Sequence, residues 1–293
     1  MDLWVIALVA ISAVLHVAWN VRLKTAGDPL RTAAVGLLAA SFVIIPVGIG
    51  WWWLNDRPAF PIEGWALGLA SGLVEAAYFV LLSAAYRRGD LSVVYPIARG
   101  TAPLVAVFIG VVILGERLGA VGAIGVALLL LGYLWLQRPW TALRRGGGGV
   151  DPAVVFAVLT GLTIAAYSAI DRVGTRIIAP IPYAAILWAT MCIALIAWVL
   201  IAAGGGVFSG GREQNRRAAV GGMLTLGAYL CILVALSVAP LSGVAPLRES
   251  ATVFAAAWGS VRLGEAATRS ETVRRVGASI LIVGGALLLA LGD

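Results

Sequence analysis

The chain has 293 residues, of which 61% are hydrophobic and only 12% charged, and its formal net charge at pH 7 is +7. Globular proteins average roughly 45–50% apolar and about 25% charged residues, so a soluble fold would lack the polar sequence to cover this core. Apolar stretches of about 18 or more residues recur along the chain, and each is long enough to cross a bilayer. The arginines lie mostly in short connections between these stretches, which indicates membrane orientation rather than nucleic-acid binding.

Ten membrane-spanning helices are predicted in chain order from these apolar stretches. They cover residues 3–21, 32–54, 65–86, 91–114, 118–137, 153–170, 181–203, 218–238, 241–261 and 273–291. The Arg- and Gly-rich stretch "RPWTALRRGGGGVDP" separates the fifth span from the sixth. It predicts a linker at 139–150 between a first five-helix unit at 1–138 and a second at 151–293.

The second half of the chain repeats features of the first half in the same order. Arg99 corresponds to Arg248, and "LGE" occurs at 114–116 and again at 263–265. Trp19-Asn20 correspond in the same way to Tyr167-Ser168. These matches could arise by chance in a sequence made mostly of apolar residues, but matches that keep their order and include rare residue types favour duplication of the five-helix unit. Because five spans is an odd number, the second unit is expected to be inverted in the membrane, around a central cavity where the repeats meet.

Basic residues predict the orientation. The connections after the first, third, fifth, seventh and ninth spans hold 15 of the 21 Lys and Arg residues. The opposite connections hold only Arg57, Arg117, Arg172 and Arg176. The positive-inside rule therefore places both termini on the non-cytoplasmic side.

The duplicated five-helix unit resembles the EamA-type members of the drug/metabolite transporter superfamily. The residues that carry the resemblance are "AWNVRLK" at 18–24, "YPIARGTAP" at 95–103 and the two copies of "LGE". The resemblance covers essentially the whole chain and implies a secondary transporter in the bacterial inner membrane. It further implies an exporter of small metabolites, with YddG-type amino-acid exporters as the leading comparison.

Arginine recurs inside the fourth and ninth spans. Arg99 lies eight residues beyond Leu91, about 12 Å along the helix, and Arg248 lies seven beyond Leu241. An arginine at the centre of a membrane helix costs about 2.5–3.5 kcal/mol on insertion scales. Each is either a snorkelling orientation charge or a cavity-facing charge that receives a substrate carboxylate. The inverted fold would place one near each mouth of the pathway.

Proline interrupts the same two spans and predicts hinges. Pro96 and Pro246 lie early in their spans, where a first-turn position is the alternative reading. Pro103 lies in the middle of its span, removes a backbone donor and is expected to kink the helix. A kink at this place would provide a pivot for alternating access.

Other polar side chains within the spans are candidates for binding. Glu75 is expected to pair with Arg99 or to take a proton, unless it is a structural ion pair; Glu249 is expected to meet another helix. His16 is a candidate for proton coupling, although an interior hydrogen-bonded histidine is the alternative. Gly64, Gly68 and Gly72 predict close packing of the third span against a neighbouring helix. The full set of predicted substrate-binding residues is His16, Trp19, Asn20, Glu75, Tyr78, Tyr95, Arg99, Tyr167, Ser168, Tyr229, Arg248 and Glu249.

Several chemistries are not expected. The one lysine, Lys24, follows leucine, so the chain has no phosphate-binding Gly-Lys-Ser/Thr loop. One histidine cannot form a His-Glu-x-x-His metal site, and Cys192 and Cys231 both lie in apolar spans. No metal, cofactor or enzymatic activity is therefore predicted.

Three functions are carried forward. The first is export of a zwitterionic metabolite, which the resemblance implies to be an amino acid, by a protein that functions as a monomer, with proton coupling or facilitated diffusion as open alternatives. Its cavity is expected between the first, third, fourth, sixth, eighth and ninth spans. The second is export of cationic drugs or another metabolite class. The third is a lipid-handling membrane protein or an intramembrane enzyme.

Overall fold

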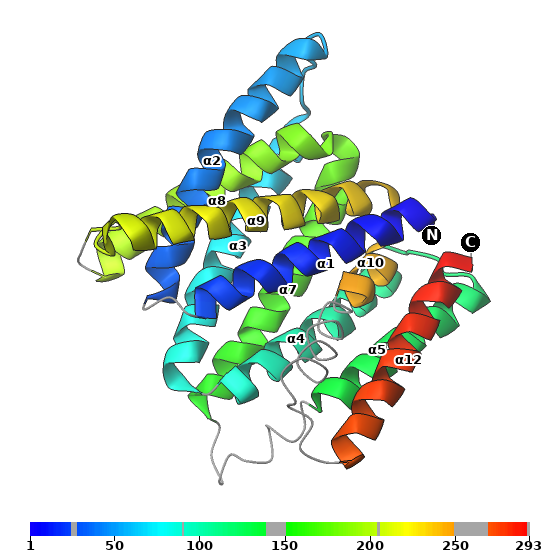
Figure 1. Cartoon of the computed structure of the whole chain (residues 1–293). Helices are drawn as coiled ribbons and strands as arrows, with labels where there is room; N and C mark the ends of the chain where they lie inside the picture. Colours follow the sequence, from blue (N-terminus) through cyan, green and yellow to red (C-terminus); the bar gives the residue numbers. More distant parts are fainter. Residues whose placement is uncertain (25–27, 90, 139–150, 204–205, 249–268, 292–293) are drawn as a thin grey trace.

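The computed structural model describes residues 1–24, 28–89, 91–138, 151–203, 206–248 and 269–291, and this part of the chain is helical apart from short connections (Figure 1). The helices are α1 Leu3–Lys24, α2 Pro29–Leu54, α3 Ile62–Arg88, α4 Leu91–Phe108, α5 Ala120–Gln137, α7 Pro152–Ile177, α8 Pro180–Ala203, α9 Gly211–Val238, α10 Leu241–Arg248 and α12 Arg269–Leu291. A π-helical turn, η1, continues α4 over Ile109–Ile113.

A helix occupies each predicted span over its described residues. The helices α2, α3, α7, α8 and α9 are long and apolar enough to cross a membrane, and α1, α4 with η1, α5 and α12 contain shorter apolar stretches. For the ninth predicted span the structure describes α10 only, because residues 249–261 lie outside the described part, as does the predicted linker at 139–150. The structure differs at α7, which continues to Ile177, seven residues beyond the predicted end at 170.

Helix starts are specified locally by the sequence. Asp28 accepts hydrogen bonds from the backbone N–H groups of Leu30 and Arg31, at 3.1 and 3.2 Å, and so caps α2. Asp151 caps α7 through the N–H of Ala153 at 2.8 Å. Aspartate before a proline at the first helical position is a favoured start, because proline lacks only an N–H that the helix does not use there.

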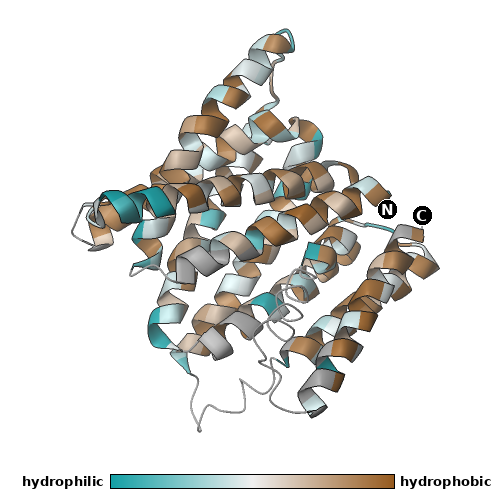
Figure 2. Cartoon of the chain, in the orientation of Figure 1, coloured by the Kyte–Doolittle hydropathy of each residue, from teal (hydrophilic) through white to brown (hydrophobic). Residues whose placement is uncertain are grey.

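The outside of the molecule is apolar. Figure 2 shows hydrophobic residues along most of each helix, with hydrophilic residues concentrated near helix ends, as at the start of α9. Large apolar side chains are strongly exposed, for example Leu54 at 87% and Ile201 at 84%. The interior instead holds buried polar groups, among them Asp171, Thr160 and Ser242, each at 0% exposure. A multi-pass membrane protein needs this distribution, since its surroundings are hydrocarbon rather than water.

Helices of the first half of the chain pack mainly on helices of the second half. The pairs with extensive contact are α5 with α12, α3 with α7 and α8, α1 with α9, α2 with α8 and α9, and α4 with α7. In Figure 1, α5 and α12 lie side by side at one edge of the molecule, and the two chain ends lie close together. The amino group of Met1 donates to the carbonyl of Leu289 at 3.2 Å.

The glycine stripe of α3 packs closely against its neighbours, as predicted. A Cβ atom at Gly72 would lie 2.5 Å from the carbonyl oxygen of Leu187 on α8, and one at Gly68 would lie 2.8 Å from Cγ2 of Ile186. Side chains at these positions would force the two helices apart, so the stripe fixes the distance between α3 and α8.

The segment after η1 holds the start of α10. Gly115 has a φ of +67°, a left-handed conformation that glycine adopts without steric cost. The turn brings the Glu116 carboxylate to the backbone N–H groups of Leu241 and Ser242, at 2.6 and 2.8 Å. Glu116 also pairs with Arg172 of α7 at 3.2 Å. The first copy of "LGE" thus caps a helix of the other half of the chain, and that helix carries Arg248.

Candidate functional site

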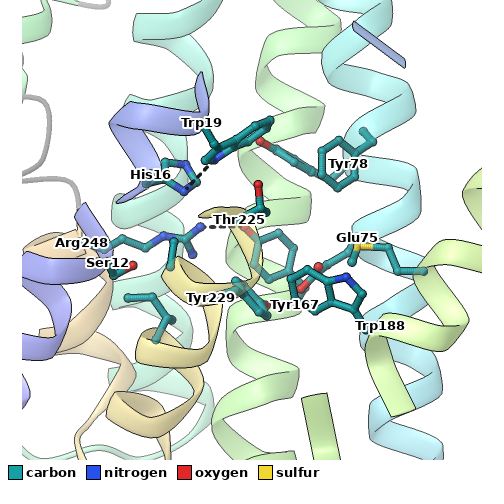
Figure 3. A pocket seen from close by; sticks show the side chains of 14 residues that line it. Ser12, His16, Trp19, Glu75, Tyr78, Tyr167, Trp188, Thr225, Tyr229 and Arg248 are labelled. Carbon is teal, nitrogen blue, oxygen red and sulfur yellow. Dashed lines mark hydrogen bonds between the residues drawn. The ribbon is translucent and has the colours of Figure 1, made fainter. Parts of the chain in front are cut away.

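A pocket lies in the interior where six helices meet (Figure 3). Its empty volume is about 440 Å³, which includes space open to its surroundings. The lining comes from α1, α3, α7, α8, α9 and α10: Ser12, His16, Trp19, Glu75, Tyr78, Phe79, Tyr167, Trp188, Met191, Thr225, Ala228, Tyr229, Ile232 and Arg248. Seven of the predicted binding residues therefore line one pocket, although they come from both halves of the chain.

The pocket wall is a continuous series of aromatic rings. The sequence of neighbouring rings runs His16–Trp19, Trp19–Phe79, Phe79–Tyr78, Tyr78–Tyr167, Tyr167–Tyr229 and Tyr229–Trp188, with centroids 5.0 to 6.3 Å apart. All but the last pair are edge-to-face, which is a favoured arrangement. Such a wall presents electron-rich ring faces and is suited to an amphipathic or cationic group.

Arg248 brings a positive charge into this pocket from the end of α10. Its side chain is 8% exposed, and Nη2 donates to the hydroxyl of Tyr167 at 3.3 Å. The guanidinium carbon lies 6.0 Å from the ring centre of Tyr167 and 5.9 Å from that of Tyr229. The flat, five-donor guanidinium is suited to receive a carboxylate in bidentate fashion.

Glu75 supplies an acidic group from α3. It is 5% exposed, and its Oε1 atom has no hydrogen-bond partner in the described part of the chain. The indole nitrogen of Trp188 is similarly buried and without a partner there. The expected ion pair with Arg99 is not found among the described residues. Buried polar groups are normally hydrogen-bonded, so these atoms of the pocket indicate a place for polar groups of a ligand.

His16 and Trp19 lie on one side of α1, as their spacing predicts. The indole N–H of Trp19 donates to Nδ1 of His16 at 3.2 Å, so this nitrogen acts as an acceptor. The predicted partner in this group, Asn20, lies on α1, but its side chain lies outside what the structure describes.

Asp171 is the principal site residue that the sequence reasoning missed. It lies on α7, is fully buried, and its Oδ1 accepts hydrogen bonds from Ser71 at 2.5 Å and Tyr183 at 2.9 Å. Its Oδ2 accepts from the hydroxyl of pocket residue Tyr229. The predicted sixth span ended at residue 170, so Asp171 was counted with the following connection. The available signal was that no proline follows until Pro180, so the chain carries no strong helix breaker over residues 171–179.

A smaller pocket adjoins Arg248 on the side of α4. Ser168 and Pro103 line it, with Ala102, Ala106, Ile164, Ile232, Leu236, Leu241, Val244, Ala245 and Arg248. Arg248 thus contributes to both pockets. Among the side chains that the structure describes, the central pocket has no lining residue from α4 and includes residues of α8 instead, which differs from the predicted set of helices.

Arg99 lies buried on α4, at 7% exposure, and is not among the lining residues of either pocket. It is close enough to His16 and Tyr78 to act on them electrostatically, and Arg248 acts on the same two side chains. The two arginines therefore converge on one central region. That one arginine lies near each mouth of the pathway stays a prediction.

The remaining predicted residues are only partly described. Helix α4 passes through Pro96 and Pro103 without ending, and the break in regular α-helix comes later, at the π-helical turn Ile109–Ile113. Pro246 lies inside α10. The side chains of Tyr95 and Pro96 lie outside what the structure describes, and so does all of Glu249.

Metal ligation has no visible basis in the described ranges. No group of three or more His, Cys, Asp and Glu side chains there is arranged to hold a metal ion.

Comparisons with known proteins support one family and one fold. Residues 1–137 match the sequence profile of the EamA-like transporter family. No curated protein matches the chain. A crystal structure of a protein is similar over 99% of this chain and 98% of its own, with a TM-score of 0.72 and 19% sequence identity. At that identity the similarity shows a shared fold and nothing of activity.

Proposed function

We propose that the chain is a secondary transporter that exports small zwitterionic metabolites, most specifically amino acids, across the bacterial inner membrane. The match of residues 1–137 to the EamA-like transporter family supports membrane transport of a small molecule. The observation that carries the choice of substrate is the presence of one buried cation and one buried, incompletely hydrogen-bonded carboxylate in a single aromatic pocket.

The pocket is suited to an amino acid in a definite orientation. Arg248 receives the substrate carboxylate, and Glu75 receives the ammonium group together with the faces of Tyr78 and Tyr167. Ring faces stabilise an ammonium by about 0.5–2 kcal/mol, more when water is excluded. The side chain of the substrate would lie against Trp19, Phe79 and Trp188.

An inverted-repeat layout of ten spans is part of this proposal. In such a layout, α1 to α5 of the first half correspond in order to α7, α8, α9, α10 and α12 of the second half. Replacing each helix by its counterpart then converts the α3–α7 pair into the α9–α1 pair. It likewise converts α3–α8 into α9–α2 and leaves α2–α8, α4–α10 and α5–α12 unchanged. Each of these pairs is in contact. A two-fold relation between repeats accounts for this reciprocity, and alternating access follows if one arrangement exchanges with the other.

Counterflow in proteoliposomes tests the proposal. Vesicles that contain the purified protein and an unlabelled amino acid inside are expected to accumulate the labelled amino acid from outside. Arg248→Gln should slow this exchange by tenfold or more, because the carboxylate of the bound substrate then loses a charge-assisted hydrogen bond of about 1.5–3 kcal/mol. Arg217→Gln is the matched control, since Arg217 is exposed and pairs with Glu213 on the surface. Equal rates for the parent and Arg248→Gln would contradict the assigned role.

Export of cations is the second candidate, and Glu75 and the aromatic wall favour it. The same vesicles distinguish the two by comparing an amino acid with the amine that lacks its carboxylate. An amino-acid exporter should exchange the amine more slowly, because Arg248 repels an amine that brings no negative charge. Faster exchange of the amine would therefore favour the cation exporter.

A further inference from the structure

A second carboxylate, that of Asp171, lies directly behind the pocket wall. Ser71 lies one turn before Glu75 on α3 and donates to Oδ1 of Asp171 at 2.5 Å, so Asp171 of α7 reaches the turn of α3 that carries Glu75. Tyr229 links them further, since it donates to Oδ2 of Asp171 and lines the pocket beside Glu75. The two carboxylates are near enough to interact electrostatically.

The environments of these two carboxylates differ sharply. Asp171 accepts hydrogen bonds from three hydroxyl groups, on α3, α8 and α9, and these donors stabilise its negative charge. Oε1 of Glu75 is buried and has no hydrogen-bond donor among the described residues. Two adjacent buried carboxylates resist double ionisation, so one of them binds a proton. Tyr229 also hydrogen-bonds to Glu75, but Asp171 has three hydroxyl donors against this one, which assigns the fixed charge to Asp171 and the proton to Glu75.

The surrounding groups are consistent with a single exchangeable proton. In the described part of the chain, the titratable or charged side chains that reach this region are His16 from α1, Tyr78 from α3, Arg99 from α4, Tyr167 from α7, Tyr183 from α8, Tyr229 from α9 and Arg248 from α10. Helix α2 contributes none to the pocket lining. Arg248 acts electrostatically on both carboxylates.

We propose that Glu75 is the proton-coupling carboxylate of this protein, that Asp171 is its fixed-charge neighbour, and that a proton and the ammonium group of the substrate compete for Glu75. This coupling step rests on the proposed function, whereas proton binding by Glu75 does not. When the pocket opens to one side, the Glu75 carboxyl group releases its proton to water, and its carboxylate accepts N–H bonds from the entering ammonium. On the other side the ammonium leaves and a proton from water returns to Glu75. One substrate is thereby exchanged for one proton.

Infrared spectroscopy of the purified full-length protein tests proton binding without any substrate. The C=O stretch of a buried protonated carboxyl group is expected in the parent protein at neutral pH and should be lost in Glu75→Gln. Glu63→Gln is the matched control, because Glu63 lies on the same helix but is exposed. Absence of the band in the parent, or its persistence in Glu75→Gln, would overturn the assignment.

The neighbouring charge gives a second, directional readout. Asp171→Asn removes the negative charge that opposes ionisation of Glu75, so the band should disappear at a lower pH than in the parent. Glu75→Asp keeps a carboxyl group and should therefore keep a titrating band. A retained band in this variant would show that the loss in Glu75→Gln comes from removal of the carboxyl group and not from misfolding. A midpoint that is unchanged or moves to higher pH in Asp171→Asn would contradict the pairing of the two carboxylates.

Transport in vesicles then tests coupling. A proton gradient should accelerate exchange in the parent and in Glu63→Gln, but not in Glu75→Gln, which should retain slower counterflow because the amide oxygen still accepts N–H bonds. Gradient stimulation that persists in Glu75→Gln, or stimulation by a sodium gradient alone, would overturn the coupling. Absence of amino-acid counterflow in the parent would refute the proposed substrate instead, and would leave the infrared result standing.

Discussion

Asp171 shows how one buried charge can be maintained inside a membrane helix bundle. A charged side chain in this position is costly unless polar groups surround it. Three hydroxyl donors from three different helices meet that need at Asp171, and they also tie α3, α8 and α9 to α7. The same residue therefore serves the stability of the bundle and the electrostatics of the pocket.

Removal of one donor should lower stability. Tyr183→Phe deletes a hydroxyl that donates to Oδ1 of Asp171 at 2.9 Å. Hydrogen bonds to charged groups contribute about 1.5–3 kcal/mol, so a loss of about 1–2 kcal/mol in the free energy of unfolding is expected, since Ser71 still donates to the same oxygen. Thermal or denaturant unfolding in detergent measures it. Tyr78→Phe is the control, because its hydroxyl makes no hydrogen bond to another described residue; equal midpoints for the two variants would contradict the role of Tyr183.

At the residue scale, the sequence located the pocket better than it located the partners within it. The spacing of His16 and Trp19 and the repeated Arg248 were sufficient to select side chains that the structure brings together. The proximity of Glu75 to Asp171 was not predictable, because it depends on how α7 continues beyond the apolar run and on which helices adjoin α3. Periodicity within one helix contains no information on contacts between helices.

At the element scale, α10 depends on a cap from the opposite half of the chain. Glu116 accepts from two backbone N–H groups and from the Ser242 hydroxyl, and it neutralises Arg172, which also donates to the carbonyl of Leu236 at 2.6 Å. Gly110 makes room for it, since a Cβ atom there would lie 2.5 Å from Glu116 Oε2. The first copy of "LGE" therefore does more than form the turn after η1, because its carboxylate caps a helix of the other half of the chain.

Loss of this cap should destabilise α10 selectively. Glu116→Ala leaves Arg172 without its carboxylate partner, and breaking a buried ion pair costs about 3–5 kcal/mol. We expect a lower unfolding midpoint together with faster hydrogen exchange at the amides of Leu241 and Ser242. Glu213→Ala is the control: Glu213 pairs with Arg216 and Arg217 at the exposed surface, where water screens the charges, so its loss should leave the midpoint nearly unchanged. Unchanged exchange at α10 in Glu116→Ala would show that the helix does not need this carboxylate.

At the scale of the whole molecule, hydropathy predicted which segments form helices more reliably than where charges lie. Apolar runs determine the spans because hydrocarbon excludes unpaired backbone groups. Arg172 illustrates the limit: it was counted as a charge of a surface connection, yet it is 9% exposed inside α7. Removing it from the connections increases the bias of basic residues toward one side, so the predicted orientation becomes better supported by charge.

The orientation can be tested on two connections that should face opposite sides. Positive-inside bias predicts that the α2–α3 connection, with exposed Ala59, is outside the cytoplasm and that the α8–α9 connection, with exposed Ser209, is inside it. In a background in which Cys192 and Cys231 are replaced by alanine, a membrane-impermeant maleimide should label Ala59→Cys in intact cells. It should label Ser209→Cys only after the membrane is permeabilised. The reverse labelling pattern would show that the protein has the opposite orientation. Labelling of both cysteines in intact cells would contradict the proposal that the two connections, separated by α3 through α8, lie on opposite sides of the bilayer.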